Sequence, residues 1–481
     1  MPTVEFRCDL SQRGTPLPHC WEHTVGSGHA LLALRSDWQT QLRQCHEDAG
    51  FRYVRFHGLL CDDVGTLIRN EGRLLESFFN ADRIIDFLIS IGMKPFVELS
   101  FMPRALASGR STVFKYRGNV TPPSRYPRWA AFIKRLVAHW VDRYGVKEVG
   151  QWFFEVWNEP NLRAFWTGSR KDYFKLYRTT VGAIKAVDPS LRVGGPATAR
   201  DGWIDEFIEF CETAHVAVDF VSTHHYPTDT DVTRAASTET RLARSRRSIL
   251  RQWAQDSRRR ARGRPLYYTE WNTSSDPGDA LHDEPYAAAF VVKTLMEVSG
   301  LVEGYSFWTF SDIFEERYFP SIPFHGGFGL MTLHGIPKPA YRAFELLHRL
   351  GHERLLVDGL HHTVDGWVVR GSGDPRKVTV LMTNHALPRH AIETERARVT
   401  LIGASEPRQA FVERIDRDHA NPKREWCAGG SPGYLDSAMV ERLQEVSHAS
   451  REPVRCDCAG GAVRFETRLP PHAVAAVTLE F

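Results

Sequence analysis

The chain has 481 residues, of which 42% are hydrophobic and 25% are charged. These values are ordinary for a globular protein, and the length provides for one large domain and a smaller one. The formal net charge of +3 is small for this length, so the composition gives no reason to expect nucleic acid as a partner. No apolar run approaches the ~20 residues that span a membrane, and no membrane association is expected.

The amino-terminal segment indicates a cytoplasmic protein, and the cysteine spacing indicates free thiols. Residues 1–10 lack the basic stretch and the apolar core of a signal peptide. The eight cysteines are scattered along a chain that is long enough to fold without disulfides, and Cys456 and Cys458 have no CxxC partner. The 21 histidines include no HExxH pattern. We therefore expect free thiols, no metal and no cofactor.

From about residue 20 to residue 350, strand-like apolar segments alternate with amphipathic segments. The amphipathic segments, such as Trp129–Tyr144 and Tyr286–Val298, repeat their apolar residues with helical spacing. Eight strand–helix repeats over ~330 residues favour a (β/α)8 TIM barrel over an open doubly wound sheet. The expected strands are His23–Gly28, Tyr53–His57, Lys94–Leu99, Trp152–Asn158, Leu191–Gly195, Phe220–His225, Leu266–Trp271 and Gly304–Phe310.

The pattern changes after Leu350. Short alternating runs such as Lys377–Asn384 and His472–Leu479 are separated by turns rich in Gly, Pro and Asp, which is typical of an all-β module. We therefore expect an α/β chain in which residues 20–351 form the barrel and residues 352–481 form a β-sandwich. Residues 1–19 include a strand-like run, Val4–Asp9, that we assign to the same sandwich.

Two glutamates stand where strand-like segments end. Trp152–Leu162 is an apolar run that stops at Asn-Glu-Pro, with Glu159 as its carboxylate, and Pro265–Ser274 passes from an apolar strand through Glu270 into a polar turn. In a (β/α)8 barrel, side chains at the carboxyl ends of the strands line the functional face. Two carboxyl groups there suit glycoside cleavage, which needs a proton donor and a nucleophile or base.

The second expected strand carries a cationic and a polar side chain on one face. Arg55 and His57 point the same way because alternate residues of a strand share a face. Arg55 is our candidate for stabilising the carboxylate of Glu270. The alternative is that Arg55 pairs with a structural carboxylate such as Glu155.

Several blocks of the sequence, in one order, resemble glycoside hydrolase family 39 of clan A and, within it, the bacterial β-xylosidases. A lone Asn-Glu-Pro would be weak evidence, whereas many blocks in the same order are specific. The blocks include YVRFHGLLCDDV (53–64), FEVWNEPNLRAFW (154–166), VDFVSTHHY (218–226), YSFWTFSDIFEE (305–316) and FHGGFGL (324–330).

The resemblance implies a retaining enzyme with Glu159 as general acid/base and Glu270 as nucleophile, their carboxyl groups ~5–5.5 Å apart. The implied activity is that of an exo-β-1,4-xylosidase, which releases xylose from the non-reducing end of xylooligosaccharides through a covalent glycosyl-enzyme. Because family members combine a barrel with a β-sandwich, the resemblance implies the same fold as the strand pattern.

The resemblance also implies residues that bind the sugar. Asn158 would bind the 2-hydroxyl group, Trp308 would form an aromatic floor, and Glu315 and Glu316 would bind the distal hydroxyl groups. The peptide bond between Trp308 and Thr309 is expected to be cis. The other implied contacts are His57, Phe165 and Trp166 on the aglycone side, His224, Tyr226 with its hydroxyl near Glu270, and His325 at the pocket rim.

Other functions fit parts of the same pattern. An α-L-arabinofuranosidase or an α-L-iduronidase could use the same barrel, although an iduronidase would need an Arg or Lys clamp for the uronic carboxylate. A non-catalytic carbohydrate-binding barrel would not need both Glu159 and Glu270. A nucleic-acid binder could use Arg241–Arg264, which has ten arginines and one acid, Asp256. We interpret that run instead as the solvated face of a barrel helix.

The expected partner is therefore the xylooligosaccharide substrate. Some members of the family that the chain resembles carry a longer tail that could exchange between subunits. This chain ends at Phe481, directly after the last expected strand, and we therefore expect a monomer.

Overall fold

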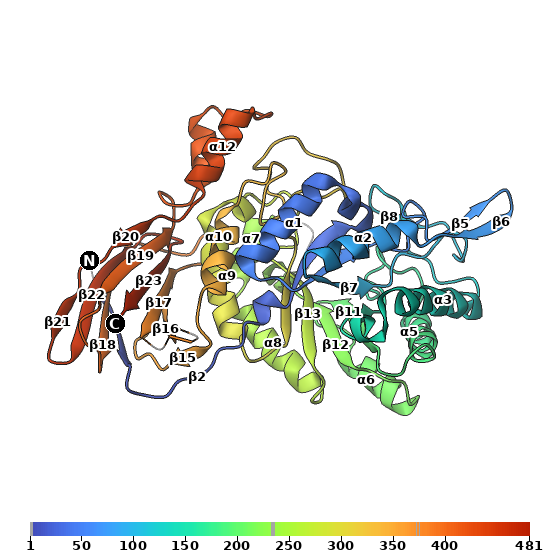
Figure 1. The fold of residues 1–481 in the computed structure, drawn as a ribbon, viewed down its shortest axis with the longest axis horizontal. Helices are drawn as coiled ribbons and strands as arrows, with labels where there is room; N and C mark the ends of the chain where they lie inside the picture. The colour runs from blue at the N-terminus through green and yellow to red at the C-terminus, as the bar shows by residue number, and fades with distance from the viewer. Residues whose placement is uncertain (1–2, 232–235, 372, 375) are drawn as a thin grey trace.

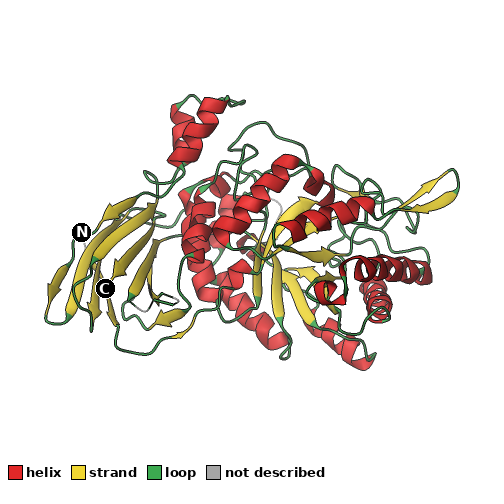
Figure 2. Cartoon of the chain, in the orientation of Figure 1, coloured by secondary structure: helices red, strands yellow, loops and turns green. Residues whose placement is uncertain are grey.

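The structure, a computed structural model, describes residues 3–231, 236–371, 373–374 and 376–481. Eight parallel strands form a closed barrel at its centre, and the last strand pairs with the first (Figures 1 and 2). Every expected barrel strand is present, so the predicted TIM barrel is confirmed. The strands are β3 (Thr24–His29), β4 (Tyr53–His57), β7 (Lys94–Glu98), β10 (Phe153–Glu155), β11 (Arg192–Ala199), β12 (Phe220–His224), β13 (Leu266–Trp271) and β14 (Gly304–Phe307).

Helices surround the barrel (Figure 2), and their sequences explain where they begin and what they bury. Helix α5 begins with a capping box, in which Ser169 and Asp172 each accept a hydrogen bond from the other's backbone N–H. Helix α3 buries a stripe of residues at helical spacing that runs from Trp129 to Trp140. The helices are α1 (Ser36–Ala49), α2 (Phe79–Ser90), α3 (Tyr126–Tyr144), α4 (Val146–Val149), α5 (Arg170–Lys185), α6 (Ile204–Thr213), α7 (Thr238–Arg244), α8 (Ile249–Arg260), α9 (Pro285–Val298) and α10 (Pro339–His348).

Short hairpins and 3-10 helices lie in the loops of the barrel. Two antiparallel hairpins, β5–β6 and β8–β9, follow the second and third barrel strands in the sequence. Four 3-10 helices lie at Cys20–Glu22, Ala30–Leu34, Pro227–Thr230 and Ala280–Asp283. The hairpin strands are β5 (Leu67–Asn70), β6 (Arg73–Glu76), β8 (Thr112–Val113) and β9 (Gly118–Asn119).

The interior of the barrel is layered. An aromatic cluster of Phe96, Phe153, Phe220 and Tyr267 fills its lower part, where the rings of Phe96 and Phe153 stack with centroids 4.9 Å apart. Alternate residues of a strand share a face, so the residues two positions further along β4, β7 and β10 point into the barrel above the rings. These residues are Arg55, Glu98 and Glu155, and all three are fully buried.

The carboxyl-terminal part forms two sheets that pack on each other around a second apolar core. Strand β1 (Thr3–Asp9) pairs in parallel with β18, and β2 (Thr15–Pro16) pairs with β15, so both amino-terminal strands join these sheets (Figure 1). We propose that residues 1–19 and 352–481 form one accessory domain on the barrel of residues 20–351. The remaining strands are β15 (Glu353–Leu355), β16 (Val364–Arg370), β17 (Lys377–Asn384), β18 (Glu395–Ile402), β19 (Gln409–Ile415), β20 (Arg451–Pro453), β21 (Asp457–Ala459), β22 (Ala462–Leu469) and β23 (Val474–Glu480).

Two helices that the sequence analysis did not predict project from the accessory sheets (Figure 1). They are α11 (Pro422–Ala428) and α12 (Ser437–Val446), inserted between β19 and β20. Trp426 on α11 packs against Phe324 in a small separate cluster, with ring centroids 5.5 Å apart. The insertion therefore supports the segment that contains His325.

The arginine-rich run is structured differently from the single helix that we expected. It spans α7 and α8, and its cations are matched by acids that are mostly distant in the sequence. Such pairing neutralises the local positive charge and supports the interpretation as an ordinary helix surface. Eight of the ten arginines form ion pairs: Arg241, Arg244, Arg247, Arg258, Arg259, Arg260, Arg262 and Arg264.

All eight cysteines lie among the described residues and are free thiols, as expected. Among the helices that the structure describes, none combines the length and apolar character that crossing a bilayer requires.

Candidate active site

Glu159 reaches the barrel mouth through the irregular backbone that follows β10. Two residues of this turn, Trp157 and Glu159 itself, have positive φ values of 75° and 42°. The Glu159 backbone N–H donates to the carbonyl oxygen of Ala197 at 2.8 Å, which ties the turn to the neighbouring strand β11. Pro160 then prevents the strand from continuing. The turn leaves the Glu159 side chain 8% exposed at the carboxyl ends of the strands.

Glu270 is the penultimate residue of β13, and the pairing of β13 with both neighbouring strands shifts register next to it. Its carboxyl group is bound from two sides. Arg55 Nη1 donates to Oε1 at 2.8 Å, and the Tyr226 hydroxyl donates to Oε2 at 3.0 Å. Both contacts hold the carboxylate oxygens in place, as a nucleophile requires.

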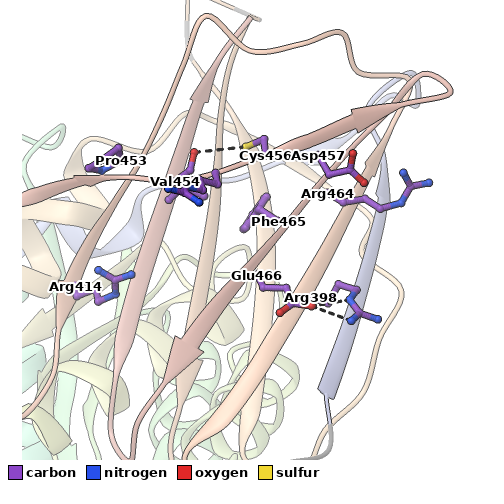
Figure 3. A pocket seen from close by; sticks show the side chains of 10 residues that line it. Arg398, Arg414, Pro453, Val454, Cys456, Asp457, Arg464, Phe465 and Glu466 are labelled. Carbon is purple, nitrogen blue, oxygen red and sulfur yellow. Dashed lines mark hydrogen bonds and ion pairs between the residues drawn. The ribbon is translucent and has the colours of Figure 1, made fainter.

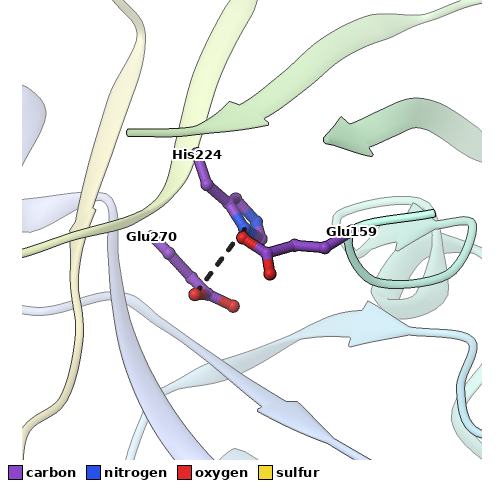
Figure 4. Close-up of side chains that lie close together, drawn as sticks. All are labelled: Glu159, His224 and Glu270. Atoms are coloured by element: carbon purple, nitrogen blue, oxygen red, sulfur yellow. Dashed lines mark hydrogen bonds and ion pairs between the residues drawn. The ribbon is translucent and has the colours of Figure 1, made fainter. Parts of the chain in front are cut away.

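Figure 4 shows the side chains of Glu159, His224 and Glu270 converging from three segments of the barrel. One oxygen of each carboxyl group and Nδ1 of His224 all lie within 4.8 Å of one another. Inverting glycosidases separate their carboxyl groups by ~6.5–9.5 Å, to leave room for water, and retaining ones by ~5–5.5 Å. The geometry therefore matches the retaining class.

Arg55 serves both of the roles that the sequence left as alternatives. Besides Glu270, it binds Glu155 through Nε at 2.6 Å and Glu98 through Nη2 at 2.8 Å. Its Nη2 also donates to Asn158 Oδ1 at 2.8 Å. One fully buried guanidinium thus orients the proposed nucleophile, the residue before the proposed acid, and two structural carboxylates.

The pKa values of Glu159 and of two buried groups near it indicate which group can act as the acid. Burial, with a further contribution from the negative charge of Asp229, raises the pKa of Glu159 to about 7. Burial lowers the pKa of His224 to about 4, so its imidazole is neutral at neutral pH. In Glu98, burial would raise the pKa, but the charges of His57 and Arg55 outweigh it and the pKa is lowered. Glu159 can therefore hold a proton near neutral pH, as a general acid must.

A pocket of about 270 Å³ opens over the two glutamates. The Trp308 indole forms one wall, beside the His57 ring with centroids 4.6 Å apart. Gly26 on β3 makes room for the indole, since a Cβ there would lie 2.5 Å from Trp308 Cε3. The Trp308–Thr309 peptide bond is cis, as expected. The other lining residues include Phe114, Asn158, Leu162, Phe165, Ala199, Arg200, Tyr226, Asp229, Ser275, Pro277, Glu316, Arg317 and Phe328.

Four of the expected sugar contacts do not line this pocket: Trp166, His224, Glu315 and His325. Trp166 is fully buried beneath the pocket, where its ring packs edge-on against Trp157 and its indole N–H donates to the carbonyl oxygen of Ser169. Its neighbour Phe165, which was also expected on the aglycone side, does line the pocket. Likewise Glu316 faces the pocket, whereas Glu315 lies near Arg35 on the outside of the loop.

His325 lies in an adjoining hollow of about 150 Å³ that shares Pro277, Arg317 and Phe328 with the pocket. Its Nδ1 lies 2.8 Å from the carbonyl oxygen of Ile322 within the same loop. Lys338 holds the segment after His325 in place, because its Nζ donates a hydrogen bond to the carbonyl oxygen of Gly327 at 3.0 Å. His325 therefore borders the site without facing the two glutamates.

Sequence reasoning missed Glu98 and Asp229. Glu98 lies two residues after Phe96 on β7, just as Arg55 lies two residues after Tyr53 on β4. This repeated pattern of an aromatic residue followed by an inward-facing charge could have identified Glu98 from the sequence. Asp229 lies in the 3-10 helix after β12, accepts hydrogen bonds from Tyr226 N–H and Arg200 Nε, and has no comparable signal. Only the folded loop brings it to the pocket.

A second hollow, of about 560 Å³, lies on the accessory sheets (Figure 3). Arg398 there is paired with Glu466, and Arg414 is paired with Glu452. The acids that line this hollow are Asp457 and Glu466, and both lie among several arginines. Such surroundings do not provide one protonated acid and one ionised nucleophile, which glycoside cleavage needs. The paired glutamates of the barrel remain the candidate for glycoside cleavage.

The same three barrel side chains are the metal-binding candidates. In the part of the chain that the structure describes, Glu159, His224 and Glu270 are the one group of at least three His, Cys, Asp or Glu side chains whose ligand atoms converge within 4.8 Å. A cation held there would occupy both carboxyl groups that glycoside cleavage uses.

Residues 4–464 match the sequence profile of glycosyl hydrolases family 39. The chain belongs to this family. A β-xylosidase from Caldicellulosiruptor saccharolyticus is 48% identical to this family 39 chain over 466 residues, which cover 96% of this chain and 95% of that protein. A β-xylosidase from Geobacillus stearothermophilus is 37% identical, over 96% and 92% of the two chains. A monomeric β-xylosidase structure from Caulobacter crescentus matches with a TM-score of 0.88 and 33% identity over 99% of both chains. The chain is thus a glycoside hydrolase.

Proposed function

We propose that this family 39 enzyme is a retaining exo-β-1,4-xylosidase that releases xylose from the non-reducing ends of xylooligosaccharides. The observation that carries the proposal is the pairing of Glu159 and Glu270, whose carboxylate oxygens lie within 4.8 Å of each other. Both full-length relatives named above are β-xylosidases, which supports xylose as the sugar. The small pocket, about 270 Å³, suits one terminal sugar and its neighbour better than a long stretch of polymer.

In the first step, Glu270 attacks C1 of the terminal xylose from the α face. Arg55 and Tyr226 hold the attacking carboxylate in place. Glu159 donates its proton to the glycosidic oxygen as the C–O bond breaks, so the leaving sugar departs as a neutral alcohol. The product of the step is an α-linked xylosyl ester of Glu270.

In the second step, Glu159 changes role from acid to base. Esterification removes the negative charge of Glu270, and Glu159 has given up its proton, so its carboxylate can accept one from water. The water attacks C1 from the β face and breaks the ester bond. Two inversions return xylose in the β configuration and restore the ionised Glu270.

The carboxyl groups around Glu316 in the pocket favour a neutral pentose over a uronic acid as the bound sugar. Glu316 Oε1 is buried, lies 3.8 Å from His57 Nε2, and has no hydrogen-bond partner among the described residues. Burial and the nearby charges of Glu270 and Glu159 raise the pKa of Glu316 well above its usual value. A further negative charge is therefore disfavoured there, which argues against an iduronide. A sugar hydroxyl could instead satisfy the unpaired oxygen.

We expect the purified enzyme to convert xylobiose to xylose and xylotriose first to xylose and xylobiose. Products are followed by anion-exchange chromatography, and the configuration of the first sugar released is read by proton NMR. Glu270→Gln is the matched control for contaminating activity. Preferential cleavage of aryl α-L-arabinofuranosides or iduronides, or release of internal fragments from long xylan, would contradict the proposal.

The pH profile should identify the acid. We expect kcat/KM to fall on the alkaline side with a midpoint near pH 7, because Glu159 must be protonated in the free enzyme and its pKa is about 7. Below this pH the acid form is present, and it is lost as the pH rises through the pKa. Glu159→Gln should abolish this limb on an aryl xyloside with a good leaving group. Survival of the limb would mean that another group is the acid.

We also propose that the enzyme acts as a monomer in the cytoplasm. The Caulobacter crescentus relative is described as monomeric, and eight free cysteines suit a reducing compartment. Light scattering coupled to gel filtration measures the oligomeric state directly.

A further inference from the structure

His224 is part of a chain of hydrogen bonds inside the barrel that ends at Glu159. Glu155 Oε1 accepts from the Thr269 hydroxyl at 2.8 Å, and the same hydroxyl oxygen lies 3.0 Å from His224 Nε2. On the other side of the ring, His224 Nδ1 lies 3.0 Å from Glu159 Oε1. All of these side chains are buried, and His224 has no exposed surface. Thr269 and His224 thus connect a structural carboxylate, Glu155, to the proposed acid, Glu159.

The direction of each hydrogen bond follows from counting protons. Glu155 is the acceptor at both of its oxygens, since Oε2 accepts from Arg55 Nε at 2.6 Å and Oε1 accepts from Thr269. Thr269 has a single hydroxyl proton, and it donates this proton in the hydrogen bond to Glu155. The hydroxyl oxygen can then only accept from His224, so the proton of the neutral imidazole must be on Nε2.

We propose that Thr269 and Glu155 fix His224 as its Nε2–H tautomer, so that the lone pair of Nδ1 accepts a hydrogen bond from protonated Glu159. His224 is then a positioning residue that stabilises the acid form of Glu159 and orients its proton. This inference rests on the proposed role of Glu159. The low pKa of His224 and the raised pKa of Glu159 agree with it, since a neutral acceptor faces a protonated donor.

The same arrangement disfavours the ionised form of Glu159 in the free enzyme. A carboxylate oxygen 3.0 Å from a lone pair would gain no hydrogen bond there, and it would lie beside the negative charge of Glu270, whose Oε2 is 3.6 Å from Nδ1. Loss of the Thr269 hydroxyl would free the ring to carry its proton on Nδ1 and donate to the carboxylate. The pKa of Glu159 should then fall.

The experiment compares Thr269→Val, which keeps the shape but lacks the hydroxyl, with Thr269→Ser, which keeps the hydroxyl. We expect Thr269→Val to move the alkaline limb of kcat/KM down by about one pH unit, the size of one hydrogen bond to a charged group. Thr269→Ser should leave the limb where it is in the wild type. The other charged or titratable groups that face the chain are the same in both variants: Arg55, His57, Glu98, Arg200, Tyr226, Asp229, Glu270 and Glu316.

A structural role for Thr269 alone would lower stability or kcat without moving the limb, and that result would overturn the inference. Neutron diffraction of the wild-type enzyme at pH 5.5 gives a test that does not depend on a variant folding. We expect deuterium on His224 Nε2 and on Glu159 Oε1, and deuterium on His224 Nδ1 would overturn the inference. If Glu159→Gln also kept the alkaline limb, the assignment of the acid would fail first, and the two failures are thereby distinguished.

Discussion

Replacing Glu270 with alanine is expected to lower kcat on aryl β-D-xylosides by ~10⁵-fold or more, because no other group can form the glycosyl-enzyme. The truncated side chain leaves space on the α face of the sugar. Azide added at high concentration should enter that space and attack C1 directly, with Glu159 still available as the acid. A single inversion gives the α-xylosyl azide, which NMR identifies by the coupling of its anomeric proton.

Glu209→Ala is the matched control for this variant, because Glu209 is an exposed glutamate on the outer helix α6. It should retain wild-type activity and give no azide product of α configuration. Formation of the β-xylosyl azide by Glu270→Ala would show that a nucleophile survives in the variant, and the assignment of Glu270 would then be wrong.

Replacing Glu159 with alanine should have an effect that depends on the leaving group. Xylobiose needs protonation of its glycosidic oxygen, so its kcat/KM should fall by ~10²–10⁴-fold. A dinitrophenyl xyloside needs no acid and should still esterify Glu270. The glycosyl-enzyme should then accumulate, because no base activates water, and a burst of phenol followed by slow turnover should appear in a stopped-flow trace.

Azide separates the two glutamates by stereochemistry. As an anion that needs no general base, it should attack the accumulated glycosyl-enzyme of Glu159→Ala from the β face and restore turnover. Two inversions give the β-xylosyl azide, opposite in configuration to the product of Glu270→Ala. Exchanged products would mean that the two roles are reversed, and mass spectrometry of the trapped ester identifies the residue that carries the sugar.

The barrel strands and the two glutamates could be predicted because each depends on a local signal. Apolar runs bounded by turns predicted all eight barrel strands, and Leu266–Trp271 matches its predicted range at both ends. Glu159 follows its strand directly before a proline, and Glu270 closes an apolar run, so both could be placed at the barrel mouth from the sequence. The blocks shared with family 39 extended this to the substrate class.

Loops and networks were predicted less well, because their geometry depends on contacts that are distant in the sequence. Of the two adjacent pairs expected in the pocket, the loop conformations place only Phe165 and Glu316 on its lining, and Trp166 and Glu315 lie off it. The helices α11 and α12 were missed altogether. Asp229 lines the pocket only because it lies in the 3-10 helix Pro227–Thr230 that follows β12.

By itself the sequence determined the barrel, the all-β character of the accessory sheets and the two candidate catalytic glutamates, since strand periodicity and chain punctuation are local properties. Only the tertiary structure decided how Arg55 is shared among Glu98, Glu155 and Glu270, and which ring nitrogen of His224 faces Glu159. The physical reason is that closing the barrel brings side chains from four or more strands within hydrogen-bonding distance in a buried space. There each proton and each lone pair is assigned by its neighbours rather than by its own residue type.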